Sequence, residues 1–309
     1  MSSDRLSLIE RARGGMLALA CGDALANGVE FMPRGGYPAI TDLHGKPRGL
    51  PVGQWSDDTG LALCLGESLV ACQAFDPVDQ MRRYRGFYER GEGWPHAVPL
   101  IAGNTLARAL ADFTATGNPY SGPTHALAAG NGGLMRLLPV VLASHRAPER
   151  CRQWCRDATR TTHGAGECLE ASDLLGRILS ALLEGRELAH ALGVGADIPW
   201  ASERIARLAQ GAYLDKPLDG IKASGYVVDT LEAALWCVAR HDGLEAPLLA
   251  AANLGDDCDT VAAVAGQIAG CAHGERAIPG QWRETLIQAE RLTDLAEALL
   301  VLSASDKEG

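Results

Sequence analysis

The sequence GDDCDT, at residues 255–260, is followed directly by a run of small apolar residues from Val261 to Cys271. A second run of oxygen-bearing side chains, SDDT at residues 56–59, precedes another apolar run, Leu61 to Val70. The length and spacing of both apolar runs are typical of buried helices. Each acidic run is therefore expected at the start of a helix. Closely spaced aspartates repel one another, and a bound divalent cation is the simplest compensation.

A plainer interpretation is that these residues are helix N-caps, because Ser and Asp are common before an apolar helix. A cap needs one such residue, however, and each run has three within four positions. Oxygen ligands favour Mg²⁺, Ca²⁺ or Mn²⁺ over zinc. The two runs together favour a two-metal centre, whose ions lie roughly 3.5–4 Å apart in known examples.

Composition favours closely packed helices. The chain has 309 residues, of which 47% are hydrophobic but only 5% aromatic, and Ala, Leu and Gly are abundant. A net charge of −10 without a block of Lys or Arg argues against non-specific nucleic-acid binding. No apolar run reaches the length of a membrane span. Nine cysteines, an odd number, suggest buried thiols in a reducing compartment, so a cytoplasmic protein is expected.

Apolar spacing predicts a chain of helices with long loops at 33–55 and 91–104. Strand patterns are absent, and no feature predicts an oligomeric state. We expect an all-α, compact single-domain orthogonal bundle over residues 1–305, with a two-metal cleft and a frayed tail at 306–309. Asp229 is expected to cap the helix that follows it. The predicted helices are 5–26, 61–70, 76–91, 104–114, 133–144, 147–159, 166–184, 200–212, 227–241, 244–253, 261–271 and one or two within 281–304.

Six blocks of sequence carry a resemblance to a known family. They are GGMLALACGDALANGVE (14–30), WSDDTGLAL (55–63), GNGGLMRLLPV (130–140), TH (162–163), GYVVDTLEAALWC (225–237) and GDDCDTVAAVAGQIAG (255–270). In this order they resemble the ADP-ribosylglycohydrolase family, which includes the dinitrogenase-reductase-activating glycohydrolase and the ADP-ribosyl-acceptor hydrolases. Six blocks in family order are a specific signal. The resemblance implies a compact all-α protein that holds two Mg²⁺ or Mn²⁺ ions and cleaves ADP-ribose from modified side chains.

The resemblance also implies roles for the two acidic runs. It leaves Asp256 outside the metal site, and it suggests that Glu30 coordinates metal or acts in acid–base chemistry, although a glutamate satisfied by local amides remains the alternative. Catalytic roles are expected for Glu30, Asp58 and Asp257. The expected metal ligands are Ser56, Asp57 and Asp58 in one half-site and Asp257, Asp259 and Thr260 in the other.

Further positions match the family's ligand-binding segments. Asn131, with Gly130 and Gly132, matches a loop near the ADP-ribose phosphates, and Gly103 with Asn104 resembles a second such loop. His163 matches a residue near the ligand, and Tyr226 matches one that borders the ribose or adenine pocket. The alternatives are a simple turn for the loop, a structural histidine and a core tyrosine.

One position departs from the arginine-directed bacterial branch. Those relatives commonly have Asp-Ile-Gly-Asn-Thr, whereas this chain has Ile101 in place of the acid, which puts arginine specificity in doubt. The expected substrate is therefore an ADP-ribosylated protein with an arginine or serine linkage. Alternatives are another ADP-ribose conjugate (O-acetyl-ADP-ribose, an ADP-ribosylated nucleic acid or a guanidine) and a non-catalytic ADP-ribose-binding or structural relative. A two-metal phosphohydrolase is a further alternative, which the glycine loops do not favour.

Overall fold

The computed structural model describes residues 6–43, 50–95, 100 and 102–305. Helices account for most of these residues, and no strand occurs in the described part of the chain, which confirms the all-α fold. The α-helices are α1 (Leu8–Ala26), α2 (Asp57–Cys72), α3 (Pro77–Arg90), α4 (Asn104–Thr116), α5 (Leu138–Ser144), α6 (Pro148–Arg160), α7 (Gly166–Leu183), α8 (Leu188–Leu192), α9 (Glu203–Ala209), α10 (Val227–Arg240), α11 (Glu245–Ala252), α12 (Cys258–His273), α13 (Gly280–Thr285) and α14 (Ala289–Ser305). Three short 3₁₀ turns complete the set: η1 (Ala126–Ala128), η2 (Leu218–Gly220) and η3 (Glu275–Ala277).

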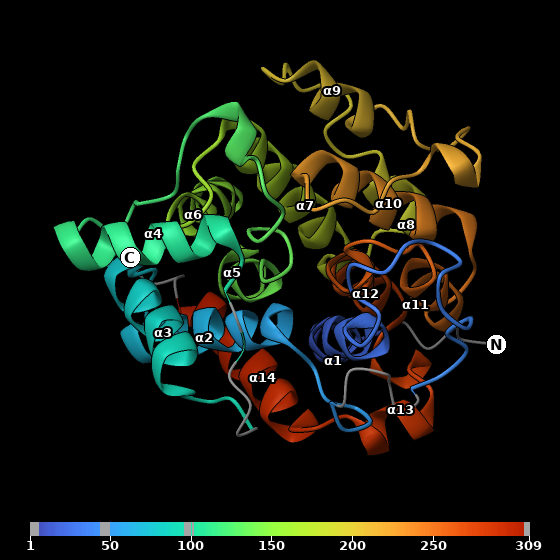
Figure 1. Cartoon of the computed structure of the whole chain (residues 1–309), viewed down its shortest axis with the longest axis horizontal. Coiled ribbons are helices and arrows are strands. Elements are labelled where there is room, and N and C mark those ends of the chain that lie inside the picture. Colours follow the sequence, from blue (N-terminus) through green and yellow to red (C-terminus); the bar gives the residue numbers. More distant parts are fainter. Residues whose placement is uncertain (1–5, 44–49, 96–99, 101, 306–309) are drawn as a thin grey trace.

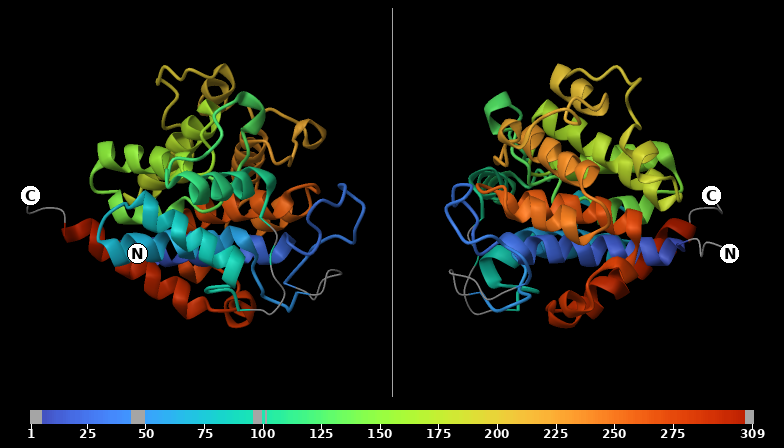
Figure 2. Two further views of the ribbon diagram at one scale, coloured as in Figure 1. Left: turned by 60° about the vertical axis from the view of Figure 1, so that its left-hand side comes forward. Right: turned by 90° about the vertical axis from the view of Figure 1, so that its right-hand side faces the viewer.

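Helices α1 and α12 form the centre of the molecule and lie side by side in Figures 1 and 2. A β-carbon on Gly22 would lie 2.2 Å from the carbonyl oxygen of Ala262, and one on Gly266 would lie 2.1 Å from that of Ala18. The two backbones are therefore in direct contact, which only small residues permit. Because these pairs run in opposite directions along the two helices, the helices are antiparallel. The end of α1 thus lies beside the start of α12.

The other helices pack around this central pair. Helix α14 lies against α1 and also contacts α2 and α5, whereas α7, α10 and α11 lie against α12. In Figure 1, α14 lies below the pair, α11 to its right and α10 above it. Buried side chains from all these helices form one continuous apolar core. This core fixes the ends of α1, α2 and α12, from which the predicted metal ligands project.

Several helix boundaries differ from the predictions. The helix expected at 133–144 begins only at Leu138, because residues 132–136 form turns in which Gly133 packs on Thr159. The helix expected at 200–212 is limited to α9, and the five-residue α8 was not predicted. The prediction that Asp229 caps a helix was wrong. Helix α10 begins at Val227, and the Asp229 carboxylate accepts a hydrogen bond from Ser224 Oγ at 2.7 Å.

The C-terminal prediction of one or two helices within 281–304 is confirmed by α13 and α14, while the expected frayed tail at 306–309 lies outside the described residues.

All nine cysteines are free thiols, and eight of them are buried. Among the described residues, no helix combines the length and apolarity that crossing a bilayer would require.

Candidate active site

The acidic runs lie at helix starts, as predicted, but their side chains do not cap those helices. Ser56 occupies the N-cap position of α2 and Asp257 that of α12, and neither side chain makes a capping hydrogen bond. Asp23 of α1 caps α2 instead. Its carboxylate accepts hydrogen bonds from the backbone N–H of Ser56, at 2.8 Å to each oxygen, and from that of Thr59, at 3.1 Å. The N-cap interpretation of both runs is therefore wrong.

Asp23 is a site residue that sequence reasoning missed. It is fully buried and also accepts a hydrogen bond from the Thr59 hydroxyl at 2.7 Å. The sequence does contain a feature that could have identified Asp23. It is the sole charged residue in the segment 14–26, whose other residues are small or apolar. A buried carboxylate in such a segment requires partners.

Three carboxylates from two segments of the chain converge, one after the end of α1 and two at the start of α12. Glu30, Asp257 and Asp259 each offer an oxygen, and these oxygens lie within 4.8 Å of one another. Asp257 and Asp259 are buried, whereas Glu30 is half-buried. Glu30 is brought there by the turn after α1, where the N–H of Phe31 donates to the Asp256 carbonyl at 2.6 Å. This arrangement follows from the antiparallel pairing of α1 with α12.

Asp58, at the start of α2, lies near the same cluster, because burial and the charges of its neighbours, Asp257 and Glu30 among them, raise its pKa. Its Oδ2 accepts a hydrogen bond from Ser56 Oγ at 3.3 Å, whereas its Oδ1 is buried without a hydrogen-bond partner among the described residues. An unpaired buried carboxylate oxygen is costly. The cluster therefore fits a hard divalent cation on two grounds, because it offers oxygen donors alone and one of them has no protein partner.

The carboxylates destabilise one another's charged forms. Burial, with Asp23 nearby, raises the pKa of Asp58 well above its usual range. Burial, with Glu30 nearby, does the same to the pKa of Asp259. Burial also raises the pKa of Asp257. A bound cation would reverse this effect by stabilising the ionised carboxylates.

The remaining predicted ligands lie at the edge of the cluster. Asp57 is half-buried and accepts a hydrogen bond from the Tyr88 hydroxyl at 2.7 Å, and burial raises the pKa of its carboxyl to about 6. Thr260 is buried in the first turn of α12. Asp256, which was left out of the metal site, is exposed and has a left-handed backbone with φ of 51°. Its side chain is thus separated from those of its two acidic neighbours.

Asn131 contacts the acidic cluster directly. Its side-chain amide donates to Asp257 Oδ2 at 2.7 Å and to Thr230 Oγ1 at 2.9 Å, and its backbone N–H donates to the Gly225 carbonyl at 3.1 Å. The predicted loop is therefore attached to the segment that carries the candidate metal ligands. The side-chain amide that was expected near phosphates holds one of these candidate ligands, Asp257, in place.

The glycines on either side of Asn131 pack against His163. A β-carbon on Gly132 would lie 2.6 Å from Cε1 of the imidazole ring, and one on Gly130 would lie 3.2 Å from Cδ2. The same position on Gly130 is 3.6 Å from Thr105 Oγ1, in the first turn of α4. Larger residues at these two positions would displace the imidazole ring. Residues 130–132, hereafter the glycine loop, therefore pack with His163 as one unit.

Two other predicted residues lie at the open N-terminus of α4. Gly103 is the N-cap of this helix and Asn104 its first residue, and both are exposed. The next residue, Thr105, lies beside Gly130 and so connects the start of α4 with the glycine loop. Ile101, the position of the missing acid, lies outside the described residues.

Tyr226 joins the glycine loop to α7 and α9. Its backbone pairs with that of Gly130, and its hydroxyl donates to Glu167 and accepts from Arg204. Burial raises the pKa of this hydroxyl to about 12. Beyond it lies a cavity of about 460 Å³, whose basic lining residues are Arg204, Arg207, Lys216 and Lys222. Tyr226 is therefore half-buried and held by polar contacts, unlike an ordinary core residue.

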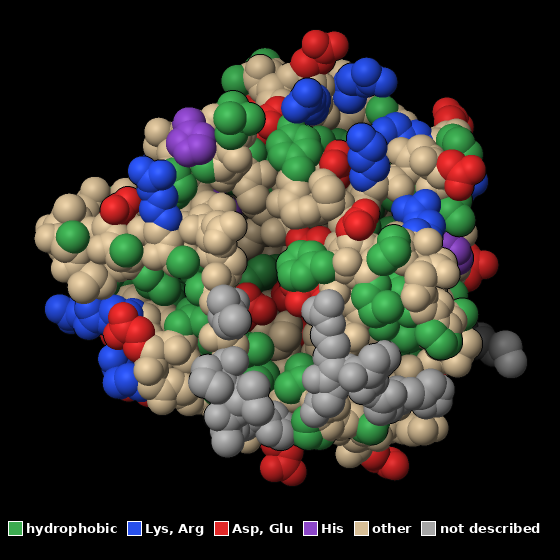
Figure 3. All heavy atoms as spheres, in the orientation of Figure 1, with side chains coloured by type: hydrophobic (Ala, Val, Ile, Leu, Met, Phe, Trp, Pro, Cys, Tyr) green, Lys and Arg blue, Asp and Glu red, His purple; other side chains and the backbone are tan. Residues whose placement is uncertain are grey.

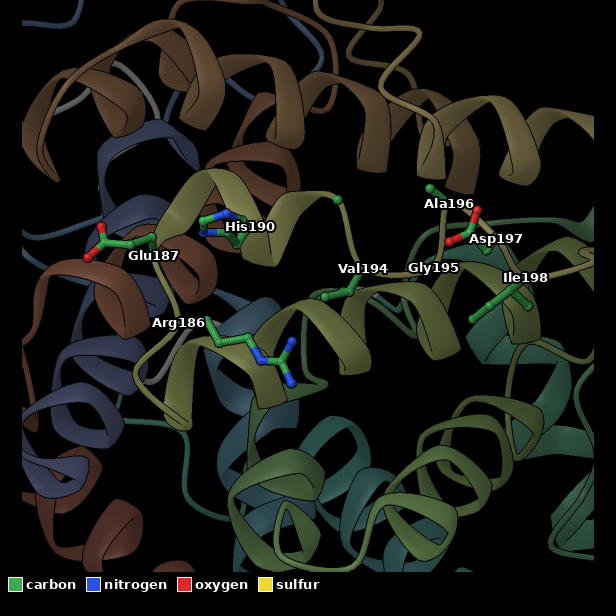
Figure 4. Close-up of a pocket in the computed structure, with 9 residues that line it drawn as sticks. Arg186, Glu187, His190, Val194, Gly195, Ala196, Asp197 and Ile198 are labelled. Atoms are coloured by element: carbon green, nitrogen blue, oxygen red, sulfur yellow. The ribbon is translucent and has the colours of Figure 1, made fainter.

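Figure 3 shows acidic side chains at the bottom of a hollow near the middle of one face, with Lys and Arg side chains gathered over the region of α9. A larger cavity of about 560 Å³ is lined by residues around α8, among them Arg186, His190 and Asp197 (Figure 4). It contains none of the predicted site residues. The hollow above the acidic cluster is therefore the candidate active site.

A model of the family described as ADP-ribosylglycohydrolase matches residues 4–309. The chain belongs to the ADP-ribosylglycohydrolase family. It is 35% identical over 300 residues to ADP-ribosylarginine hydrolase Tri1 of Serratia proteamaculans, which covers 96% of this chain and 81% of that protein. It is 33% identical to ADP-ribosyl-[dinitrogen reductase] glycohydrolase of Rhodospirillum rubrum, over 97% of this chain and 99% of the relative.

The fold of this ADP-ribosylglycohydrolase family member has a solved counterpart. The structure described as an ADP-ribosylglycohydrolase-related protein complex superposes with a TM-score of 0.85 at 40% sequence identity, over 96% of this chain and 99% of the other. The resemblance inferred from six sequence blocks is thereby confirmed. Family membership over the whole chain, together with named hydrolase relatives, makes this protein a glycosyl hydrolase.

Proposed function

We propose that this protein removes ADP-ribose from mono-ADP-ribosylated protein side chains and requires two Mg²⁺ or Mn²⁺ ions. The observation that carries the proposal is the meeting of Glu30, Asp257 and Asp259, with Asp58 close enough for its charge to raise the pKa of Asp259 further. One buried oxygen of Asp58 has no hydrogen-bond partner among the described residues. Structural carboxylates would cap helices or pair with cations. These lie together in spite of their mutual repulsion.

The ions would be held by the two half-sites. Asp57 and Asp58, with Ser56, would supply the first set of oxygens, and Asp257 and Asp259, with Thr260, the second. Bound divalent ions supply Lewis-acid activation of water and a template for the hydroxyl groups of the sugar. Asn131 keeps Asp257 oriented toward this set by its 2.7 Å hydrogen bond.

The bond to be cleaved joins C1″ of a ribose to a side-chain nitrogen or oxygen. Its transition state resembles an oxocarbenium ion, as in other glycosidases, and nearby carboxylates such as Asp58 stabilise the developing positive charge. Glu30 is half-buried, so it can reach substrate and water as well as the cluster. We assign it the role of accepting the proton from the attacking water.

The rest of ADP-ribose would extend along the glycine loop. The lack of side chains on Gly130 and Gly132 lets the His163 ring pack directly against this loop, so that both would border the ligand. The N-terminus of α4, with Gly103 and Asn104 exposed, provides free backbone N–H groups suited to a phosphate. Tyr226 would border the ribose or adenine at the far end of the loop.

The linkage is proposed from the relatives. The Serratia relative is named as an ADP-ribosylarginine hydrolase, which favours an arginine linkage here. Ile101, in place of the acid found in arginine-directed relatives, favours serine or another conjugate instead. Assays on matched arginine-linked and serine-linked peptides separate these possibilities.

The metal assignment is tested by a pair of adjacent variants. Asp257→Asn should reduce ADP-ribose release by at least about 100-fold, because it removes a candidate ligand. Asp256→Asn, at the exposed neighbour, should leave release close to wild type. Full turnover by Asp257→Asn would contradict the two-metal assignment. Binding of ADP-ribose by the wild type without turnover of any conjugate would favour a binding protein.

A further inference from the structure

Arg136 is a buried cation next to the candidate active site. Its side chain is 1% exposed, and its guanidinium carbon lies 4.6 Å from the centre of the Tyr84 ring. No ion pair of Arg136 occurs within the described ranges, and its Nη1 has no hydrogen-bond partner among them. Its Nη2 donates to Thr162 Oγ1. A buried, always charged side chain in this position calls for an explanation.

The hydrogen bond from Arg136 determines what Thr162 can do. An arginine has only donors, so the Thr162 oxygen must accept from it. The same oxygen lies 2.8 Å from Nδ1 of His163. Among the described residues no other acceptor is hydrogen-bonded to the Thr162 hydroxyl, so its single proton is directed to this nitrogen, which is then an unprotonated acceptor. A neutral imidazole with an unprotonated Nδ1 carries its proton on Nε2.

The other ring nitrogen points toward the glycine loop. Nε2 of His163 lies 3.0 Å from the position that a β-carbon would occupy on Gly132, and 3.3 Å from that on Gly130. No described residue accepts a hydrogen bond from it. His163 is 5% exposed, which leaves a small surface for contact with a ligand.

We propose that Arg136 and Thr162 are positioning residues that fix His163 as the Nε2–H tautomer, so that this N–H donates to an acceptor oxygen of the ligand at the glycine loop. The identity of the ligand, ADP-ribose, rests on the proposed function, whereas the tautomer does not. Burial and the charge of Arg136 also lower the pKa of His163 to about 3. The ring is therefore neutral at physiological pH, and the tautomer decides whether it donates or accepts.

The hydrogen bonds from Arg136 to Thr162 and from Thr162 to His163 form a relay that fixes the tautomer of His163. Nitrogen-15 NMR of the free protein tests this relay without any assay of activity. The wild type should show the His163 ring as one neutral tautomer with the proton on Nε2, unchanged between pH 6 and 8. Thr162→Val removes the hydroxyl and should convert this signature to that of a mixture of tautomers. Thr162→Ser keeps the hydroxyl and should restore it.

Thr161→Val is the matched control. Thr161 is also fully buried, but its hydroxyl donates to the carbonyl of Ala158 at 2.8 Å and is not hydrogen-bonded to His163. This variant should leave the His163 signals at their wild-type values. A proton on Nδ1 in the wild type would overturn the relay, as would wild-type His163 spectra in Thr162→Val.

Calorimetric titration with ADP-ribose, in the presence of Mg²⁺, tests the donor role. Thr162→Val should weaken binding about 3- to 10-fold, the usual effect of one hydrogen bond, and Thr162→Ser should recover it. Unchanged affinity in Thr162→Val, with an altered tautomer, would refute donation to the ligand. If the wild type itself does not bind ADP-ribose, the proposed function fails while the NMR result still decides the relay.

Discussion

Asp23, near the end of α1, accepts hydrogen bonds from the backbone N–H of Ser56 with both oxygens of its carboxylate, each at 2.8 Å. One helix thus supplies the N-cap of another, and the acids at the start of α2 are left available for the cluster. Asp23→Ala should lower the free energy of unfolding by about 2 kcal/mol, because it leaves buried N–H groups unpaired. Chemical denaturation with and without Mg²⁺ measures this. Unchanged stability would show that the cap is dispensable.

The bond from Asn131 to Asp257 should matter for metal affinity more than for folding. Asn131→Ala removes the amide that stabilises the ionised carboxylate, so the pKa of Asp257 should rise further. Supporting residues of this kind typically contribute 10- to 100-fold to metal affinity, and we expect a weakening of about that size. Titration of the metal-free variant with Mn²⁺ measures it. Wild-type affinity would argue that Asp257 is not a ligand.

Close contact between α1 and α12 makes certain glycines irreplaceable. Gly266→Ala would put a β-carbon 2.1 Å from the carbonyl oxygen of Ala18, so the helices must separate. We expect a loss of about 3 kcal/mol in unfolding free energy or failure to fold. Gly166→Ala, in the first turn of α7 with open space around it, is the matched control and should be neutral or slightly stabilising. Thermal melts of both variants decide the point.

The acidic cluster predicts an unusual pH dependence for the metal-free protein. The pKa of Asp57 is raised from 3.8 to about 6 on folding, and the pKa values of Asp58 and Asp259 are raised as well. The folded state therefore binds more protons than the unfolded state above pH 4. These groups should make stability fall as pH rises from about 4 through 6.

A bound divalent ion should remove this penalty, because it stabilises the ionised carboxylates. Adding Mg²⁺ or Mn²⁺ should thus raise the melting temperature more at pH 7.5 than at pH 5. The control is Asp257→Asn, in which the shift at pH 7.5 should shrink. Equal shifts at both pH values would indicate that the ion binds elsewhere.

Local patterns in the sequence predicted much of this protein. The apolar runs after Ser56 and Asp257 identified helices, and the density of acids exceeded what caps require. The hydrogen bonds of Asp23 with Ser56 and of Asn131 with Asp257 could not be predicted in this way, because they join residues 33 and 126 positions apart. They depend on how α1 packs beside the start of α2 and how the 130–132 loop packs beside the start of α12, which no local pattern specifies.

The acidic cluster is proposed to hold the ions that this protein needs to release ADP-ribose. The most direct test incubates the purified protein with an arginine-linked ADP-ribosylated peptide and its serine-linked counterpart, in Mg²⁺, in chelator, and in chelator followed by excess Mn²⁺. We expect release from one linkage with Mg²⁺, at least about 100-fold less in chelator, and recovery on adding Mn²⁺. Release that persists in chelator, or no release from either peptide under any condition, would contradict the account.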